Sequence, residues 1–372
     1  RQKSRELRRL AFSAPHVHEE MLELSRQYDH EMTRLRNTQY HSFFAEVDQM
    51  DASEISKITC SVYTRRARRR ATLEQEPEDL ESYADFYESQ FKTPNGEITT
   101  FDQPALRLQD KPIIQEHAVL MAILRMPKGK APGASKFCTE LLKPVATFAC
   151  RPIAMLFNEI VRLGVVPSSW REALIAPIPK KENPLGIGEH RPISLTEHLR
   201  KCFEHCLLGY VTRAVEPLNA SQCGFRHDRS TIDQCATLQE IILQFHKQHG
   251  KAPEIVFLDI KAAYDSVDRG LLWRQAAAKG VNPFIIRVLR ALFDDNRSNV
   301  VVANKRSRQF QHAAGLLQGS VLSPVLYSIF IDPLAAKLEE HATLTLANRR
   351  TAGLFYADDI ALVAESRPRM RQ

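Results

Sequence analysis

The stretch FYADDIALV, residues 355–363, sets two adjacent aspartates, Asp358 and Asp359, between two apolar runs. Short apolar runs on either side of a polar step predict a β-hairpin, here two strands around a tight turn between residues 353 and 363. Neighbouring carboxylates at the ends of buried strands repel each other and are costly unless a cation joins them. The stretch therefore predicts a hairpin with a charged site at its tip.

A second apolar run, EIVFLD at residues 254–259, also ends in a carboxylate. If this predicted strand lies beside the hairpin, Asp259 comes next to Asp358. Carboxylates suit Mg²⁺, and two such ions about 3.5–4 Å apart can activate an attacking hydroxyl and stabilise a leaving pyrophosphate. An isolated Asp pair is more often a solvated turn, but the second strand-end carboxylate favours a metal site for polymerase chemistry.

Basic residues upstream are suited to binding phosphate. Lys180 and Lys181 follow a predicted strand at residues 173–178, and Arg191 comes shortly after them. On neighbouring strands of a hairpin, Arg can bind a triphosphate as a two-pronged donor and Lys as a point charge. Alone, such residues are usually ordinary surface charges. Together with an acidic metal site downstream, they predict a triphosphate clamp.

The segment GLLQGSVLSP, residues 315–324, lies between the two carboxylate-bearing runs. Gly319 allows a close backbone approach to a substrate, and the Gln318 amide can bind a base or a sugar. A hydrolase nucleophile at Ser320 is disfavoured, because the residue lacks the G-x-S-x-G spacing and we find no convincing triad. The segment is therefore interpreted as a substrate-binding loop.

Apolar patterns and turn residues outline the remaining elements. A further strand is expected at 300–303, and helices are expected at 113–126, 195–215, 232–248 and 322–340. Because helices and strands do not alternate regularly, the pattern favours an α+β fold over a doubly wound sheet.

Four motifs follow one another along the chain: RPISL at 191–195, FLDIKAAYD at 257–265, GLLQGSVLSP at 315–324 and FYADD at 355–359. In order and spacing they resemble the reverse transcriptase domain of non-LTR (LINE-type) retrotransposons, and they are more distantly similar to group II intron reverse transcriptases. The resemblance covers roughly residues 120–366.

The resemblance implies a right-hand polymerase fold, with fingers at 112–253 and a palm at 254–372. In the family the palm continues beyond the Asp-Asp hairpin into a primer-gripping hairpin and a helical thumb, whereas this sequence stops thirteen residues after Asp359. We therefore expect the thumb to be missing, an unpaired edge on the palm sheet, and weak or absent processive polymerisation by these residues alone.

The resemblance also implies roles for individual residues. Two Mg²⁺ ions, or Mn²⁺ in their place, are expected on three carboxylates, of which Asp359 is the least essential direct ligand. The nucleic-acid partners that it implies are an RNA template and a DNA primer or target, with dNTPs as substrates. The implied metal ligands are Asp259, Asp358 and Asp359; the triphosphate clamp is Lys180 or Lys181 with Arg191; Gln318 and Gly319 lie along the incoming nucleotide and template; and Lys128 and Lys130 lie on the template side of the fingers.

Tyr264 is expected to select the sugar of the incoming nucleotide. It follows Asp259 by five residues, and in the family an aromatic ring at this point presses on the 2′ position. A bulky ring excludes a 2′-hydroxyl by overlap, which favours deoxynucleotides. The alternative, a core tyrosine on an amphipathic helix, is less favoured in this context.

Residues 1–111 are polar with helical spacing, and we predict an N-terminal helical basic extension. Its basic run contains Arg65, Arg66, Arg68, Arg69 and Arg70. Such a run is a solvated helix face, an arm that binds nucleic-acid phosphates, or a nuclear address. The net charge of +7 agrees with a polyanionic partner but does not prove one.

Composition and cysteine usage limit the class of protein. With 44% hydrophobic and 26% charged residues among 372, fibrous and disordered classes are excluded. No apolar run is long enough to cross a bilayer, so we expect an intracellular protein without a membrane partner. The resemblance implies that it acts in the nucleus after a cytoplasmic ribonucleoprotein stage. The seven cysteines include no CxxC pair, which favours reduced thiols. A zinc site is a minor alternative on Cys202, His205, Cys206, Cys223 and His227.

Two other functions stay open. A catalytically silent polymerase-like fragment could bind RNA through its fingers and N-terminal extension without copying it. An RNA-dependent RNA polymerase is the other, and it is disfavoured by Tyr264 and by the Tyr-Ala-Asp-Asp turn at 356–359. The leading hypothesis is an RNA-directed DNA polymerase domain.

Overall fold

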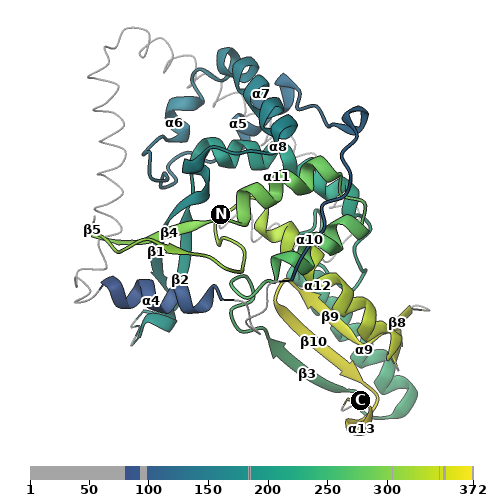
Figure 1. Ribbon diagram of the computed structural model, residues 1–372. Coiled ribbons are helices and arrows are strands. Elements are labelled where there is room, and N and C mark those ends of the chain that lie inside the picture. Colours follow the sequence, from purple (N-terminus) through teal and green to yellow (C-terminus); the bar gives the residue numbers. More distant parts are fainter. Residues whose placement is uncertain are drawn as a thin grey trace, which may run out of the picture.

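The computed structural model describes residues 80–92 and 99–370, apart from positions 183, 185, 304, 343 and 347–348. Most helices gather at one end of the molecule, and a three-stranded sheet lies at the other end, near the C-terminus (Figure 1). None of the helices in these ranges is both long and apolar enough to cross a membrane. The mixture of helices and sheets that the sequence predicts is confirmed.

The helices of the described residues are α4 (Leu80–Gln90), α5 (Glu116–Arg125), α6 (Thr139–Leu142), α7 (Ala146–Leu163), α8 (His198–Val215), α9 (Thr231–His249), α10 (Arg269–Ala278), α11 (Pro283–Phe293), α12 (Ser323–Glu340) and α13 (Arg367–Met370). The apolar spacing predicts α5, α8, α9 and α12, whereas α6, α7, α10, α11 and α13 were not predicted. The strands are β1 (Glu172–Pro179), β2 (His190–Leu195), β3 (Glu254–Asp259), β4 (Arg297–Val302), β5 (Lys305–Arg306), β6 (Phe310–Gln311), β7 (Leu344–Leu346), β8 (Arg349–Thr351), β9 (Gly353–Tyr356) and β10 (Asp359–Ala364).

The helix predicted at 195–215 is wrong at its start. Leu195 is the last residue of β2 and pairs with Leu174 of β1, and the helix α8 begins at His198. The apolar residues of RPISL satisfy a helical pattern as well as a strand pattern, and only the partner strand β1 decides between them. The predicted helices at 113–126, 232–248 and 322–340 correspond to α5, α9 and α12.

The larger sheet has the order β2-β1-β4-β5, with β6 also paired to β4. β1 and β2 form an antiparallel hairpin, whereas β1 and β4 run parallel, so the sheet is mixed. α4 packs against this sheet, where Ala84, Tyr87 and Phe91 form a small buried cluster with residues of β1, β4 and β6. The hairpin predicted from the two basic segments is therefore confirmed.

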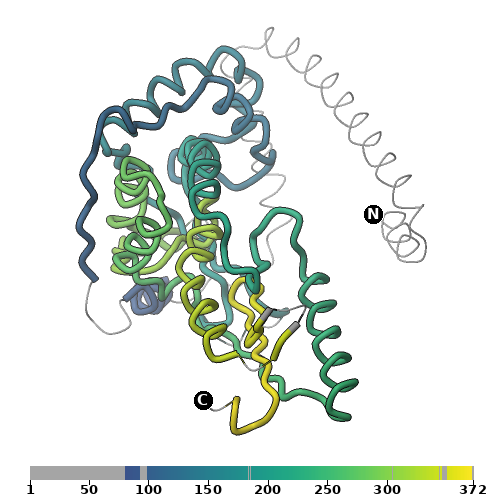
Figure 2. Tube along the Cα trace, turned by 90° about the vertical axis from the view of Figure 1, so that its right-hand side faces the viewer, coloured from purple at the N-terminus to yellow at the C-terminus, as the bar shows by residue number. Residues whose placement is uncertain are grey.

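The smaller sheet has the order β3-β10-β9. The two strands predicted around the Asp-Asp turn are β9 and β10, and β3 is the predicted third strand. Alternation sends Phe355 and Ile360 into the main core on one face of the sheet, and Leu354 and Val363 toward α9 on the other. α9 stands beside this sheet (Figure 2). β3 is an edge strand of this sheet, and its Phe257 is 74% exposed.

The main hydrophobic core runs through both predicted subdomains. It contains Phe157 of α7 and Phe203 of α8 together with Leu289 of α11, Leu326 of α12 and Phe355 of β9. The boundary between 112–253 and 254–372 stays a prediction, because this continuous core does not mark it.

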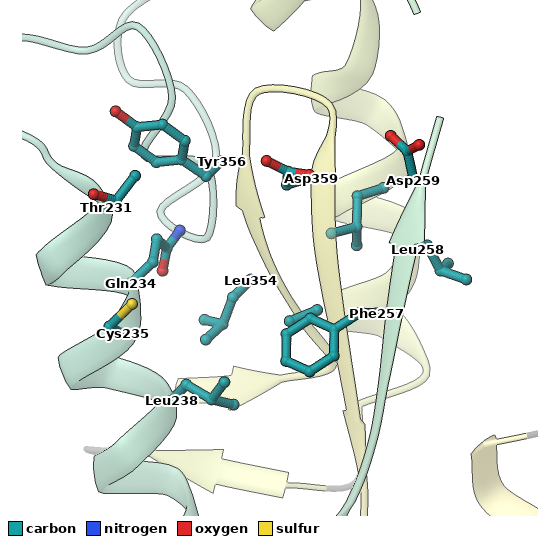
Figure 3. A pocket seen from close by; sticks show the side chains of 12 residues that line it. Thr231, Gln234, Cys235, Leu238, Phe257, Leu258, Asp259, Leu354, Tyr356 and Asp359 are labelled. Carbon is teal, nitrogen blue, oxygen red and sulfur yellow. The ribbon is translucent and has the colours of Figure 1, made fainter. Parts of the chain in front are cut away.

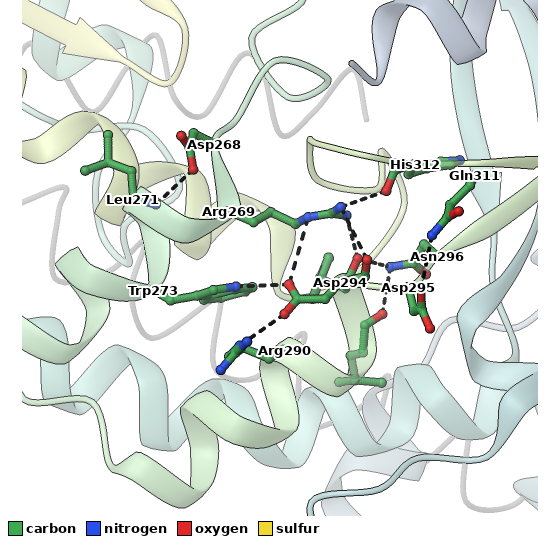
Figure 4. A network of polar contacts seen from close by, with 12 residues as sticks. Asp268, Arg269, Leu271, Trp273, Arg290, Asp294, Asp295, Asn296, Gln311 and His312 are labelled. Carbon is green, nitrogen blue, oxygen red and sulfur yellow. Dashed lines mark hydrogen bonds and ion pairs between the residues drawn. The ribbon is translucent and has the colours of Figure 1, made fainter. Parts of the chain in front are cut away.

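A network of polar contacts ties α10 to α11 and to the chain near β6 (Figure 4). The Arg269 guanidinium donates to the carbonyls of Phe293 at 2.5 Å and His312 at 2.7 Å. The Asp294 carboxylate accepts from the indole of Trp273 and the guanidinium of Arg290, both at 3.1 Å. Because α10 follows directly on the turn after β3, this network holds the base of that turn in place.

Candidate active site

Three carboxylates meet at one end of the smaller sheet. β3 and β10 are antiparallel in a register that sets Asp259 directly opposite Asp359, and Figure 3 shows both side chains at the same end of the strands. Asp358 lies in the turn between β9 and β10. The predicted proximity is confirmed with one correction: the ladder partner of Asp259 is Asp359, because the turn displaces Asp358 from the ladder.

The environment of Asp358 disfavours its negative charge. Burial raises the pKa of the Asp358 carboxyl above its ordinary value, and the charges of Asp359 and Asp259 raise it further. Its own backbone amide and the guanidinium of Arg191 act in the opposite direction. Repulsion among three neighbouring carboxylates is the condition under which a bound cation is most stabilising.

Within the described ranges, no three His, Cys, Asp or Glu side chains are arranged as a ready-made metal site, and this holds for Asp259, Asp358 and Asp359 as well. Their chemical type nevertheless fits a hard cation, since all three contribute carboxylate oxygens. Sequence reasoning predicted the donor types, whereas the strand register shows how they are placed.

The buried loop that contains Gln222 and Gly224 contacts the Asp-Asp turn through hydrogen bonds. Sequence reasoning missed this loop. The Gln222 side chain is fully buried, and its amide oxygen accepts from the backbone of Gly224 at 2.7 Å and of Ala357 at 3.2 Å. The Gln234 amide donates to the carbonyl of Phe355 at 2.7 Å. No local signal could have found it, because the partner Ala357 lies 135 positions away in the sequence.

Gly224→Ala is expected to displace the Asp-Asp turn. A Cβ on Gly224 would overlap the backbone nitrogen of Ala357, which cannot move aside without moving the turn. We expect a loss of about 1–3 kcal/mol in the free energy of unfolding, measured by chemical denaturation. Gly209→Ala in α8 is the control, since a Cβ there meets nothing within 4 Å, and it should be neutral or stabilising. Equal stability of the two variants would contradict this packing argument.

The β1–β2 hairpin brings basic residues toward the carboxylates. Arg191 is exposed, pairs in register with Ile178, and lies within electrostatic reach of Asp358. The Lys180 ammonium donates to the carbonyl of Gly188 at 3.0 Å, and Lys181 forms an exposed ion pair with Glu189 at 2.6 Å. Of the three predicted clamp residues, Arg191 is therefore the one that the electrostatics connect with Asp358.

Tyr264 lies in the turn after β3, and other rings brace it. Its ring stacks on Tyr327 of α12 with a centroid distance of 5.1 Å and an interplanar angle of 10°, and Phe225 meets it edge-on at 6.4 Å. Burial raises the pKa of the Tyr264 hydroxyl, and the charge of Asp358 raises it further. The Tyr264 ring is thus half-buried, packed against Tyr327 on one face, and within electrostatic reach of Asp358.

The predicted substrate loop is anchored at its backbone. The carbonyl of Gln318 accepts from the Ser194 amide of β2 at 2.7 Å, and a Cβ on Gly319 would overlap the carbonyl oxygen of Ser194. The close approach that Gly319 permits here is to β2. The Ser320 hydroxyl is buried and donates to the Glu204 carboxylate at 2.9 Å.

Glu204 belongs to a fully buried ion pair that sequence reasoning missed. Arg200 and Glu204 are one turn apart on α8, their side chains are 0% exposed, and the guanidinium Nε lies 2.7 Å from the carboxylate. The second Glu204 oxygen accepts from the Ser320 hydroxyl and from the Val321 amide at 2.7 Å. Arg200 also donates to the carbonyl of Trp170. Burial of the pair could not be inferred from an ordinary-looking i, i+4 pattern.

A pocket of about 320 Å³ lies beside the carboxylates, between α9 and the smaller sheet (Figure 3). Asp259, Asp359 and Tyr356 line its upper end, while Leu238 and Phe257 line its lower, apolar part. A ligand in this partly apolar pocket would therefore contact Asp259 and Asp359.

Other predicted site residues lie apart from this cluster. Lys128 and Lys130 lie in the loop after α5, and Lys130 lies within electrostatic reach of Lys201 on α8. The basic run from Arg65 to Arg70 lies outside the described residues. Of the residues considered for zinc, Cys202 and Cys206 are buried in the main core, whereas the His227 side chain is 94% exposed.

Comparisons with known proteins agree with this geometry. Residues 178–372 match the family model described as reverse transcriptase (RNA-dependent DNA polymerase). The chain is 34% identical over 292 residues to the probable RNA-directed DNA polymerase from transposon BS of Drosophila melanogaster, covering 76% of this chain and 31% of that protein. It is 30% identical over 254 residues to the polymerase from mobile element jockey of Drosophila melanogaster, covering 66% of this chain and 27% of that protein.

A third relative is the probable RNA-directed DNA polymerase from transposon X-element of Drosophila melanogaster. It is 30% identical over 275 residues, which cover 72% of this chain and 29% of that protein. The chain thus spans less than a third of the length of each of these three relatives. By its family match, the chain belongs to the reverse transcriptase (RNA-dependent DNA polymerase) family, and it is related to the polymerases of non-LTR retrotransposons.

Proposed function

We propose that this domain extends the 3′-hydroxyl of a DNA primer with deoxynucleotides, using RNA as the template. The observation that carries the proposal is the register of the smaller sheet, which pairs Asp259 with Asp359 and leaves Asp358 in the adjoining turn. In the reaction, the primer hydroxyl attacks the α-phosphate of the incoming nucleotide, and pyrophosphate leaves.

Asp259, Asp358 and Asp359 would hold the divalent cations of this family, with Mg²⁺ as the proposed ion. When bound, such ions lower the pKa of the attacking hydroxyl and neutralise charge on the leaving pyrophosphate. The chain's own contribution is to hold Asp259 and Asp359 on two paired strands and to place the half-buried Asp358 in the adjoining turn. Arg191, within electrostatic reach of Asp358, would bind the triphosphate, with Lys180 at the end of β1 as a second positive group.

Tyr264→Ala is expected to admit ribonucleotides. The stack on Tyr327 prevents the ring from retreating, so a 2′-hydroxyl has to overlap it. Overlap of this kind costs on the order of 1–3 kcal/mol, and its removal should improve ribonucleotide use about tenfold to a hundredfold. Competition between ribo- and deoxynucleotides in single-nucleotide incorporation measures this ratio. Tyr264→Phe keeps the ring and should keep the wild-type preference; a preference unchanged in Tyr264→Ala would remove the argument for a DNA product.

The test of the proposed function is primer extension by the 372-residue chain with an RNA template, a DNA primer and Mg²⁺. Incorporation of one nucleotide should depend on the template base and disappear when a chelator removes the cation. Salt-sensitive RNA binding without any incorporation would instead support the silent RNA-binding fragment. The nuclear site of action stays a prediction.

A further inference from the structure

Asp265 is a buried carboxylate that the proposed metal site does not use. Its residue is 3% exposed, and the Gln318 side-chain nitrogen donates to its Oδ1 at 3.1 Å. Within the described part of the chain, no Lys, Arg or His forms an ion pair with it. A buried carboxylate without an ion-pair partner is costly to maintain, which points to a specific role.

The loop that carries Gln318 is fastened to the turn that carries Asp265. The amide of Leu316 donates to the carbonyl of Tyr264 at 2.8 Å, and the amide of Gly315 donates to the carbonyl of Val267 at 2.9 Å. With the Gln318 carbonyl already held by Ser194, the backbone on both sides of the contact is fixed. What remains free to vary is the orientation of the Gln318 amide.

An ionised carboxylate accepts hydrogen bonds and donates none. It therefore attracts the nitrogen of the Gln318 amide and repels its oxygen. The amide oxygen and the second N–H hydrogen are then available to a ligand. If the amide turned over, its oxygen would face the carboxylate and the groups offered to a ligand would be exchanged.

We propose that Asp265 is a positioning residue, which fixes the direction of the Gln318 amide and thereby determines how the incoming nucleotide's sugar or base is bound. The inference rests on the proposed function, because it takes Gln318 as a contact of that nucleotide. The inference goes beyond the proposed function because it assigns a role to Asp265, a carboxylate that neither the metal site nor the sugar selection by Tyr264 requires.

The titration of Asp265 is consistent with this role. Burial raises the pKa of Asp265 to about 6, against the lowering effects of the Gln318 hydrogen bond and the charge of Lys180. Tyr87 of α4 also lies within electrostatic reach, and its buried hydroxyl has no hydrogen-bond partner. Once protonated, Asp265 can donate as well as accept, so the preference for one amide orientation is lost below this pH.

A double-mutant cycle on single-nucleotide incorporation tests the assignment. Asp265→Asn and Gln318→Ala should each raise the KM for the incoming nucleotide about tenfold, equivalent to ~1.4 kcal/mol, with a smaller change in kcat. The double variant should be no worse than the worse single variant, because both changes remove the same contact. Asp268→Ala is the control: it removes the side-chain acceptor for the Leu271 amide at the N-cap of α10 and should lower stability without changing KM.

The assignment would be overturned if the KM of the double variant rose by the product of the two single-variant factors. An unchanged KM in Asp265→Asn would overturn it as well. If the wild-type chain incorporates no nucleotide, the proposed function is wrong. A second measurement, which does not depend on activity, then tests the Asp265–Gln318 contact. NMR titration of the carboxyl carbon should show a higher pKa for Asp265 in Gln318→Ala than in wild type, since the amide no longer stabilises the charge. Identical titration curves would overturn the inference independently of activity.

Discussion

Asp358→Asn is expected to reduce Mg²⁺-dependent primer extension by about three orders of magnitude, the scale on which a single electrostatic catalytic group acts. Asp358 lies in the turn beside the Asp259–Asp359 pair, and the charges of both partners raise the pKa of its carboxyl. The substitution keeps the shape of the side chain and removes the negative charge that would hold a cation. Asp259→Asn should have a similar effect, whereas Asp359→Asn should have a smaller one.

Binding of RNA separates loss of the metal site from loss of the fold. Affinity for the template should be nearly unchanged in Asp358→Asn, because binding through phosphates depends on Lys and Arg. Asp102→Asn, which neutralises an exposed aspartate outside the sheet, should extend primers like wild type. Retained extension in Asp358→Asn or Asp259→Asn would refute the assignment of the carboxylates.

Glu204→Ala is expected to lower the free energy of unfolding by about 3–5 kcal/mol, because it leaves the Arg200 guanidinium buried without its counter-charge. It also removes the acceptor for the Ser320 hydroxyl and the Val321 amide, so the loop carrying Gln318 loses its second anchor. Chemical denaturation measures the first effect. Nucleotide KM measures the second in any variant that remains folded.

A matched ion pair on the surface provides the control. Arg162 and Glu159 are separated by 2.7 Å on α7, the same distance as in the Arg200–Glu204 pair, but both side chains are about half exposed. Water and salt screen that pair, so Glu159→Ala should change stability little. If Glu204→Ala were as mild as Glu159→Ala, burial would not be what makes the α8 pair important.

The local features of this site could be read from the sequence because each depends on neighbouring residues. An apolar run that ends in a carboxylate predicts β3 and Asp259, and the Asp-Asp step between apolar runs predicts the β9–β10 hairpin. The same reasoning failed at Leu195, where a strand pattern and a helix pattern coincide. Pairing with Leu174 of β1 settles that position.

The residues that hold the site together were missed for one physical reason. The partners are far apart in sequence: Ser320 and Glu204 differ by 116 positions, and Ala357 and Gln222 by 135. Nothing in the local pattern around Glu204, Gln222 or Asp265 distinguishes a buried polar residue from a solvated one. Their burial and their partners exist only once distant segments have packed together.

The sequence by itself determined β3 and the β9–β10 hairpin, the chemical types of the candidate ligands and the family, since these follow from short-range patterns and from motifs in a fixed order. Tertiary structure decided the register that places Asp259 opposite Asp359, the bracing of Tyr264 by Tyr327, and the pairing of Asp265 with Gln318. Register and bracing depend on contacts between distant elements. Their free energy comes from burial and hydrogen bonding, which a linear pattern does not contain.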